Sequence, residues 1–196
     1  VALLRALFTP SYENIYVHNE DVTNEVKNYV SLIAPEKAGI VKLYTGKVPI
    51  FDNFSITKQI KAGFGRVVNY KHGAYLIIEH TEALHVVDVN SGTRVKTGKD
   101  QEQNAFDVNC HAAQEIARQL KLRDMGGIII VDFIDMDDMN HRKSLMQALD
   151  EFVKPDPVKT TVVDMTALNL VEMTRKKIRK PVLEQLKDIE NMQSNV

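Results

Sequence analysis

The stretch GGIIIVDFID, residues 126–135, decides the class of fold because it joins a β-branched apolar run to carboxylates at its end. An uninterrupted run of this kind is typical of a strand that is buried on both faces, as in sheets that carry helices on both sides. Before it, apolar residues recur at helical spacing at Phe106, Cys110, Ala113, Ala117 and Leu120. The stretch therefore predicts a long helix that leads into a central strand, which is the pattern of an α/β protein.

Strands and helices alternate on both sides of this stretch. Further strands are predicted at residues 13–18, 39–44, 66–70, 74–79, 84–90, 158–165 and 170–174. Further helices are predicted at residues 22–33, 56–64 and 141–153, with a polar helix or tail at 181–196. The predicted class is α/β (α+β) with a mixed sheet.

The composition is that of an ordinary globular protein. The 196 residues are 44% hydrophobic and 26% charged, with a net charge of -1, which excludes a disordered, collagen-like or disulfide-framed chain. The single cysteine, Cys110, allows neither a disulfide nor a Cys-based zinc site within one chain, so a reducing cytoplasm is the expected location. No apolar stretch approaches the roughly 20 residues of a membrane span.

Two of the predicted strands end in carboxylates, at Asp88 and at Asp132. Strand alternation places Asp88 and Asn90 on one face, with Val86 of that face expected in the core. Two carboxylates about 4 Å apart repel one another, and a divalent cation would remove the repulsion. Oxygen ligands from few carboxylates suit Mg²⁺, whereas the alternative is that each Asp caps a strand end or pairs with a base. Asp135 lies just beyond and could support such a site.

Basic residues are concentrated near the end of the chain. They comprise Arg175, Lys176, Lys177, Arg179 and Lys180, and Lys121 and Arg123 precede the central strand. Such a run is either a solvated helix start or a contact surface for a phosphate backbone. If the run is a contact surface, we expect Lys121, Arg123, Arg175 and Lys176 to contact the phosphate backbone. The histidines at 80, 85, 111 and 141 lack ligand spacing and are expected to be structural or exposed.

Four ordered blocks of this sequence resemble the ribonuclease E/G family. The first is TEAL at 81–84 with DVNSG at 88–92, and the second is ARQLKLRDMGGIIIVDFIDM at 117–136. The third is LVEMTR at 170–175, and the fourth is IVKLYTG at 40–46 with PIF at 49–51. Together the resemblance covers nearly the whole chain.

The resemblance implies a division into subdomains. Residues 1–38 are similar to the end of the family's 5′-sensor region, and residues 39–79 to part of its RNase H-like subdomain. Residues 80–180 resemble the mixed-sheet, DNase I-like catalytic subdomain, and residues 181–196 follow it as a C-terminal helix or tail.

The resemblance also implies a chemistry. In the family, one Mg²⁺ is held by two Asp residues at the positions of Asp88 and Asp132, and an Asn at the position of Asn90 orients the site. The implied activity is endonucleolytic cleavage of single-stranded RNA, preferably with 5′-monophosphorylated ends. The implied roles are rRNA processing and mRNA decay, in a full-length parent that is a homo-oligomer. The alternative is a non-catalytic RNA-binding or assembly module with structural Asp residues.

Some features depart from the family pattern. The S1 RNA-binding domain, most of the 5′ sensor and the Cys-x-x-Cys zinc link are not found in these residues, and the chain begins at Val1 inside an apolar run. We therefore expect a central fragment of a longer protein, nearest to the ribonuclease G branch and weakly active alone. Asn169 stands where the family usually has Gly, before the LVEM block.

Overall fold

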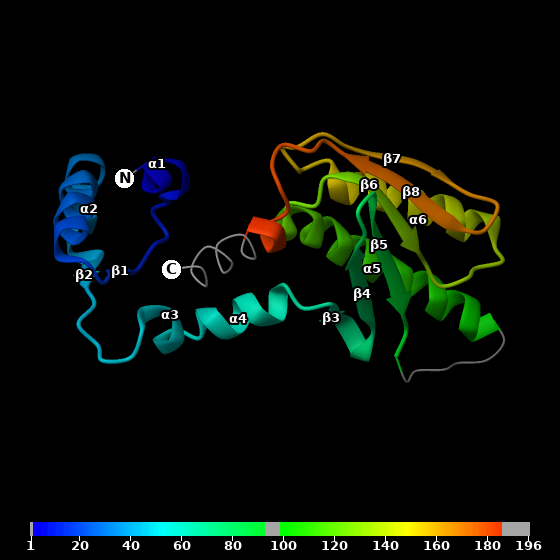
Figure 1. Ribbon diagram of the computed structural model, residues 1–196, viewed down its shortest axis with the longest axis horizontal. Helices are drawn as coiled ribbons and strands as arrows, with labels where there is room; N and C mark the ends of the chain where they lie inside the picture. The colour runs from blue at the N-terminus through cyan, green and yellow to red at the C-terminus, as the bar shows by residue number, and fades with distance from the viewer. Residues whose placement is uncertain (1, 93–98, 186–196) are drawn as a thin grey trace. The chain divides into compact units, whose positions relative to one another are not determined.

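The computed structural model describes residues 2–92 and 99–185 (Figure 1). The chain divides into two compact units, Val1–Ile60 and Lys61–Val196, so the division falls inside helix α4 (Ile56–Gly63). The boundary expected after residue 79 falls within a strand that runs to His80. Most of the helix expected at 181–196 lies outside the described residues.

The first unit is a small assembly of helices around two short strands. It contains α1 (Ala2–Leu7), β1 (Ile15–Val17), α2 (Glu20–Ile33), the 3-10 helix η1 (Pro35–Ile40), β2 (Val41–Leu43) and α3 (Ile50–Asn53). Strands β1 and β2 pair in parallel. Val26 and Val30 of α2 pack on Val41 of β2, which confirms the predicted amphipathic helix.

The second unit is built on a six-stranded mixed sheet of order β3-β4-β5-β6-β8-β7. Its strands are β3 (Val67–Asn69), β4 (Tyr75–His80), β5 (Leu84–Asn90), β6 (Gly127–Asp132), β7 (Thr160–Met165) and β8 (Leu170–Arg175). Strands β5 and β6 are parallel and the other pairs are antiparallel. The short 3-10 helix η2 (Lys71–Gly73) closes the β3–β4 hairpin. The predicted α/β class with a mixed sheet is confirmed.

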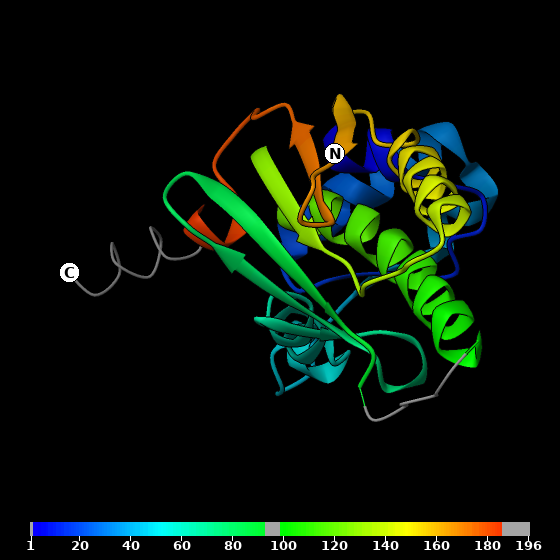
Figure 2. The ribbon, with the colours of Figure 1, turned by 90° about the vertical axis from the view of Figure 1, so that its right-hand side faces the viewer.

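Two helices cover one face of this sheet. Helix α5 (Lys99–Arg123) connects the parallel strands, and α6 (Met139–Val153) packs beside it (Figure 2). Beneath them lie Val87, Ile129 and Val131, which are almost completely buried. Apolar side chains on one stripe of each helix therefore join the apolar side of the sheet in a single core.

The opposite face of the sheet is only partly covered, so two sequence predictions are wrong. The central strand is not buried on both faces, because Ile128 is 49% exposed while Ile129 is 0% exposed. Val86 does not point into the core, because the buried residues of β5 are the alternate ones, such as Val87. The polar ends of β5 and β6 therefore project from the open face. No helix of the described residues has the length and apolarity needed to cross a membrane.

Candidate active site

The structure brings Asp88 and Asp132 together at the carboxyl ends of two neighbouring strands. They are direct register partners across the parallel pair β5 and β6. Both side chains share the open face, where Asp88 is half-buried and Asp132 is exposed. This arrangement follows from the parallel pairing of β5 and β6, which places the carboxyl ends of both strands at the same end of the sheet.

Asn90 lies on the same face as Asp88, two residues further along β5. Its amide Nδ2 donates a hydrogen bond of 2.9 Å to Asp88 Oδ2. This bond fixes the orientation of the Asp88 carboxylate and leaves Oδ1 for another partner. Asn90 therefore has the orienting position that the resemblance implies.

The electrostatics of the pair disfavour two negative charges. Desolvation raises the pKa of Asp132, and repulsion from Asp88 and then Asp135 raises it further. A cation bound between the carboxylates would offset this repulsion. Among the described residues there is no cluster of three or more His, Cys, Asp or Glu suited to a metal ion. The acid groups that the described residues bring together at this edge are Asp88 and Asp132, with Asp135 nearby.

A buried amide that the sequence reasoning missed fixes the loop after Asp132. Asn109 of α5 is 0% exposed. Its Nδ2 donates to the Ile134 carbonyl at 2.8 Å, and its Oδ1 accepts from the Ile134 N–H at 3.0 Å. This pair of bonds satisfies both backbone groups of Ile134 and holds the loop against the helix. The available signal was a polar residue beside the apolar stripe of a predicted helix.

Two further side chains secure the same loop. Glu102 accepts hydrogen bonds from the Asp137 N–H at 2.9 Å, the Asp138 N–H at 3.3 Å and His141 Nδ1 at 2.9 Å. These bonds, first that of Asp137, lower the pKa of Glu102. Arg142 Nε donates to the Met136 carbonyl. The segment that carries Asp132 and its neighbours is thus anchored to both covering helices.

Asp135, in the loop after β6, contacts the turn between β7 and β8. Its Oδ1 accepts a hydrogen bond of 3.1 Å from Asn169 Nδ2. Asn169 has a φ of 62°, in the left-handed region that glycine favours and that Asn tolerates better than most residues. The turn therefore forms with Asn where the family usually has Gly, and the Asn side chain adds a contact that glycine could not.

The two arginines expected to contact RNA are buried. Arg175 donates from Nη1 to Asp124 at 2.8 Å and from Nε to Asp156 at 2.9 Å, with 3% of its side chain exposed. Arg123 donates from Nε to Gln119 and from Nη2 to the carbonyls of Gly63 and Gly65.

These contacts change the interpretation of both residues. The N–H groups of each guanidinium donate hydrogen bonds to partners in the second unit. If the side chain turned outward to a phosphate, those buried partners would lose their hydrogen bonds. A phosphate contact by Arg123 or Arg175 is therefore not supported. Arg175 joins β8 to the residue after α5, and Arg123 joins α5 to the carbonyls of Gly63 and Gly65. The sequence did not reveal that Arg123 and Arg175 are buried, because runs of basic residues are usually exposed.

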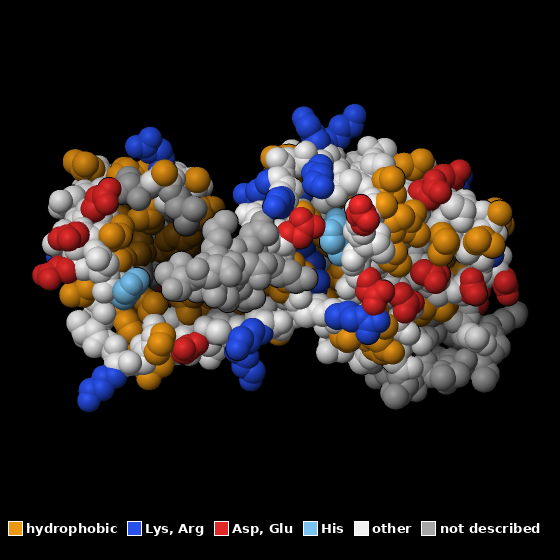
Figure 3. Space-filling view, in the orientation of Figure 1, with side chains coloured by type: hydrophobic (Ala, Val, Ile, Leu, Met, Phe, Trp, Pro, Cys, Tyr) orange, Lys and Arg blue, Asp and Glu red, His pale blue; other side chains and the backbone are white. Residues whose placement is uncertain are grey.

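The exposed part of the basic run begins after Arg175. Lys176, Lys177 and Arg179 are exposed, and Figure 3 shows Lys and Arg side chains gathered over the segment that follows β8. Arg179 forms an ion pair with Asp124. Lys121, near the end of α5, is also exposed. Lys121 and Lys176 thus remain accessible for the contacts expected of them.

Two histidines form a cluster away from the acid pair. His85 is 3% exposed, and its Nδ1 lies 3.1 Å from Nδ1 of His80, whose Nε2 lies 2.7 Å from Glu184. Burial, followed by repulsion from His80, lowers the pKa of His85 to about 4. His85 is thus a neutral core residue, which agrees with the expected structural role.

Comparison with known proteins places the chain in a family. The model of the Ribonuclease E/G family matches residues 1–178. Ribonuclease G of Escherichia coli (strain K12) is 39% identical over 180 residues, which cover 92% of this chain and 37% of that protein. Ribonuclease G of Haemophilus influenzae is 39% identical over 178 residues, which cover 91% of this chain and 36% of that protein. Ribonuclease E of Escherichia coli (strain K12) is 37% identical over 165 residues, which cover 84% of this chain and 16% of that protein.

The chain therefore spans little more than a third of the ribonuclease G relatives that it matches. The family model nevertheless covers both compact units and every residue of the candidate site. Since the family match extends over nine-tenths of the residues, the chain belongs to the ribonuclease E/G family.

Proposed function

We propose that this chain is the central part of a Mg²⁺-dependent endoribonuclease that cleaves single-stranded RNA and leaves 5′-phosphate and 3′-hydroxyl ends. The observation that carries the proposal is the register pairing of Asp88 with Asp132 at the ends of two parallel strands. The relatives named ribonuclease G and ribonuclease E support it. Roles in rRNA processing and mRNA decay, a cytoplasmic location and a homo-oligomeric full-length protein belong to the same proposal.

The chemistry of the donor set fits Mg²⁺. Asp88 and Asp132 would hold the ion through carboxylate oxygens, the ligands that this hard cation prefers. An ion with only two protein ligands keeps coordination positions for water and for phosphate oxygens, as magnesium sites that act on phosphates require. When bound, the ion would neutralise charge on the scissile phosphate and make an attacking water more acidic.

The chain's own residues supply the geometry. Asn90 holds the Asp88 carboxylate by its 2.9 Å hydrogen bond, and Asn109 holds the loop after Asp132. Positioning of this kind matters because in-line attack on phosphorus, with departure of the 3′ oxygen, depends on alignment more than on covalent participation by the protein. The acid pair projects from the partly covered face of the sheet. Asp132 is exposed there and can be reached by an extended RNA strand.

The competing function is a non-catalytic RNA-binding or assembly module. The exposed cations Lys121 and Lys176 serve either function. Against a purely structural role, no base within hydrogen-bonding or ion-pair distance of Asp132 is found among the described residues, whereas structural Asp124 pairs with two arginines. An uncompensated acid pair is more readily explained by a bound cation than by strand capping.

The test is cleavage of a 5′-monophosphorylated single-stranded RNA by the full-length protein, with Mg²⁺ or with EDTA. We expect cleavage only with Mg²⁺, and a downstream product whose 5′ end polynucleotide kinase can label only after phosphatase treatment. Binding of the RNA without any cleavage in Mg²⁺ would favour the assembly module. The isolated 196-residue chain is expected to cleave much more slowly, because it contains little more than a third of its relatives' length to position the RNA.

A further inference from the structure

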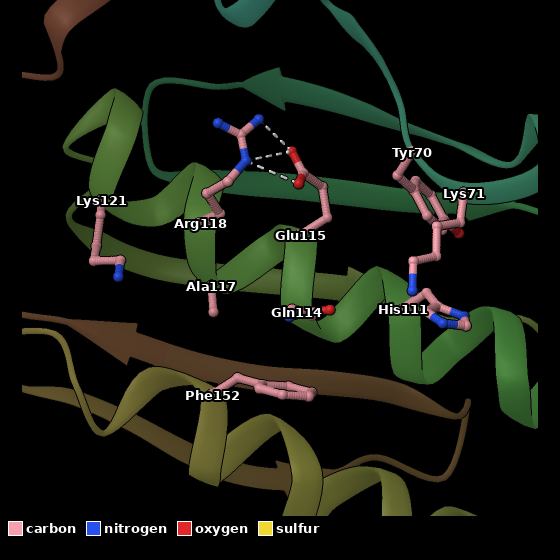
Figure 4. Close-up of a pocket in the computed structure, with 9 residues that line it drawn as sticks. All are labelled: Tyr70, Lys71, His111, Gln114, Glu115, Ala117, Arg118, Lys121 and Phe152. Carbon is pink, nitrogen blue, oxygen red and sulfur yellow. Dashed lines mark hydrogen bonds and ion pairs between the residues drawn. The ribbon is translucent and has the colours of Figure 1, made fainter.

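A hollow in the second unit lies on the helix-covered side, away from the open face that carries the acid pair. It has a volume of about 540 Å³ and lies between the β3–β4 connection, α5 and α6 (Figure 4). Its walls include Tyr70, Lys71, Glu115, Arg118, Lys121 and Phe152. A hollow of this size is within the usual range for binding a small molecule or one unit of a polymer.

The rim of this pocket is positively charged. Lys71, Arg118 and Lys121 are all exposed; Lys71 belongs to η2, and the other two belong to α5. Among its lining residues Glu115 is the single carboxylate. Its oxygens already accept bonds from Arg118 at 2.6 to 3.1 Å and from Gln119 at 2.8 Å. The two lysines therefore keep a net positive charge at the mouth, which suits an anionic ligand.

The interior of the pocket is aromatic. Phe152 of α6 and Tyr70 at the end of the β3–β4 hairpin are partly buried and pack against the core, so their rings are held in place. Figure 4 shows the Phe152 ring facing α5 across the hollow, with Lys71 reaching down beside His111. The Tyr70 hydroxyl is buried without a hydrogen-bond partner among the described atoms.

Fixed aromatic rings beside cationic rims favour one class of ligand. Aromatic side chains stack on nucleobases, and lysine and arginine bind the phosphates that accompany them. An inorganic anion would make no stacking contact with the aromatic rings, and an apolar ligand would form no ion pair with the three cations. The combination matches a nucleotide.

The pocket lies near the end of β5 that carries Asn90. Tyr75, four residues after Lys71, is the register partner of Asn90. A side chain at Gly92 would collide with the carbonyl of Gly73, so the chain after β5 runs directly against η2. Lys71 thus lies at the end of the sheet where Asp88 and Asn90 project. An RNA strand that crosses the acid pair can turn around this end toward the pocket.

We propose that this pocket binds a nucleotide through its base and its phosphate, and that in the working enzyme this nucleotide belongs to the RNA chain beyond the cleavage site. Phe152 and Tyr70 contact the base, and Lys71 and Lys121 contact phosphates. The RNA part of this inference rests on the proposed function, whereas nucleotide binding as such does not. A free nucleotide has the same chemistry, and the test separates the two sources.

The test compares two variants of the chain in EDTA, where no cleavage interferes. Lys71→Glu with Lys121→Glu reverses two rim charges, and Lys143→Glu makes the same change at an exposed site of α6 outside the pocket. We expect the double variant to bind a fluorescein-labelled ten-nucleotide adenosine RNA roughly tenfold or more weakly, since each lost pair is charge-assisted. The slope of log affinity against log salt should become shallower by about 1.4. Lys143→Glu should match the unchanged chain.

A second arm identifies the source of the nucleotide. If adenosine monophosphate raises the melting temperature of the unchanged chain but not of the double variant, free nucleotides also bind the pocket. If only the RNA responds, the ligand is the RNA chain. Equal RNA binding by the double variant and by Lys143→Glu would overturn the proposal. That result is distinct from failure of the proposed function, in which the full-length protein would not cleave RNA in Mg²⁺ at all.

Discussion

At the residue scale, the candidate site depends on side chains that the strand ends present and on others that hold them. Asp88, Asn90 and Asp132 could be selected from the sequence because carboxylates at the ends of apolar strands are conspicuous. Asn109 could not, since its function depends on a backbone segment 25 residues away. Hydrogen bonds between distant segments leave no spacing pattern along the chain.

Replacing Asn109 tests whether this buried amide positions the loop. Asn109→Leu leaves the Ile134 N–H and carbonyl without partners, so we expect the free energy of unfolding to fall by about 2 kcal/mol. Cleavage by the full-length protein should fall as well, because Asp132 precedes that loop. Gln103→Leu, on the exposed side of the same helix, should change neither quantity. Urea unfolding and initial cleavage rates measure both, and wild-type values for Asn109→Leu would show that the loop is held by other contacts.

The His85 cluster predicts how stability depends on pH. The pKa of His85 is about 4 in the folded chain, below the ordinary value near 6.5. Above pH 6.5 the imidazole is neutral in both states, whereas between pH 6.5 and 4 the unfolded chain takes up a proton that the folded chain excludes. The free energy of unfolding should therefore decrease by about 1–2 kcal/mol from pH 7 to pH 5.

The matched variants isolate this contribution. His85→Val should flatten the decrease between pH 7 and pH 5, and His18→Gln, at an exposed site, should leave it unchanged. The measurement is urea unfolding at a series of pH values. An identical slope for His85→Val and the unchanged chain would mean that His85 titrates normally in the folded state.

At the element scale, helix α5 and strand β8 show where sequence reasoning fails. The hydrophobic spacing correctly predicted both elements, but it did not reveal that Arg175 of β8 pairs with Asp124, the residue that follows α5. A run of basic residues resembles a surface because most such runs are exposed. Here the first arginine is directed inward by strand alternation, which places Arg175 on the same buried side as Val171 and Met173.

This difference between neighbouring residues can be measured. Arg175→Met removes a charge that pairs with Asp124 and Asp156, and we expect it to destabilise the chain by about 3–5 kcal/mol because the partner carboxylates stay buried. Lys176→Ala should leave stability unchanged and reduce the salt slope of RNA binding by about 0.7. Thermal unfolding and salt-dependent binding separate the two. Weaker RNA binding by a stable, folded Arg175→Met would restore Arg175 as a phosphate contact.

At the scale of the whole molecule, the sequence was sufficient for the class of fold and the family but not for which face of the sheet is covered. The apolar run at 128–131 predicted burial on both sides, yet Ile128 is about half exposed. An apolar strand can bury either face or both. The packing of α5 and α6 against one side of the sheet determines which face is buried here. The open face is therefore a property of the assembled second unit, and it is the face from which the acid pair projects.

The central claim is that Asp88 and Asp132 together hold the ion on which cleavage depends. The most direct measurement is the rate of cleavage of a 5′-monophosphorylated RNA by full-length Asp88→Asn and Asp132→Asn in Mg²⁺, beside Asp164→Asn, an exposed acid of the same sheet. We predict a loss of about 100-fold or more for each of the first two, with normal folding, and an unchanged rate for Asp164→Asn. A rate close to that of the unchanged protein for either Asp88→Asn or Asp132→Asn would contradict the account.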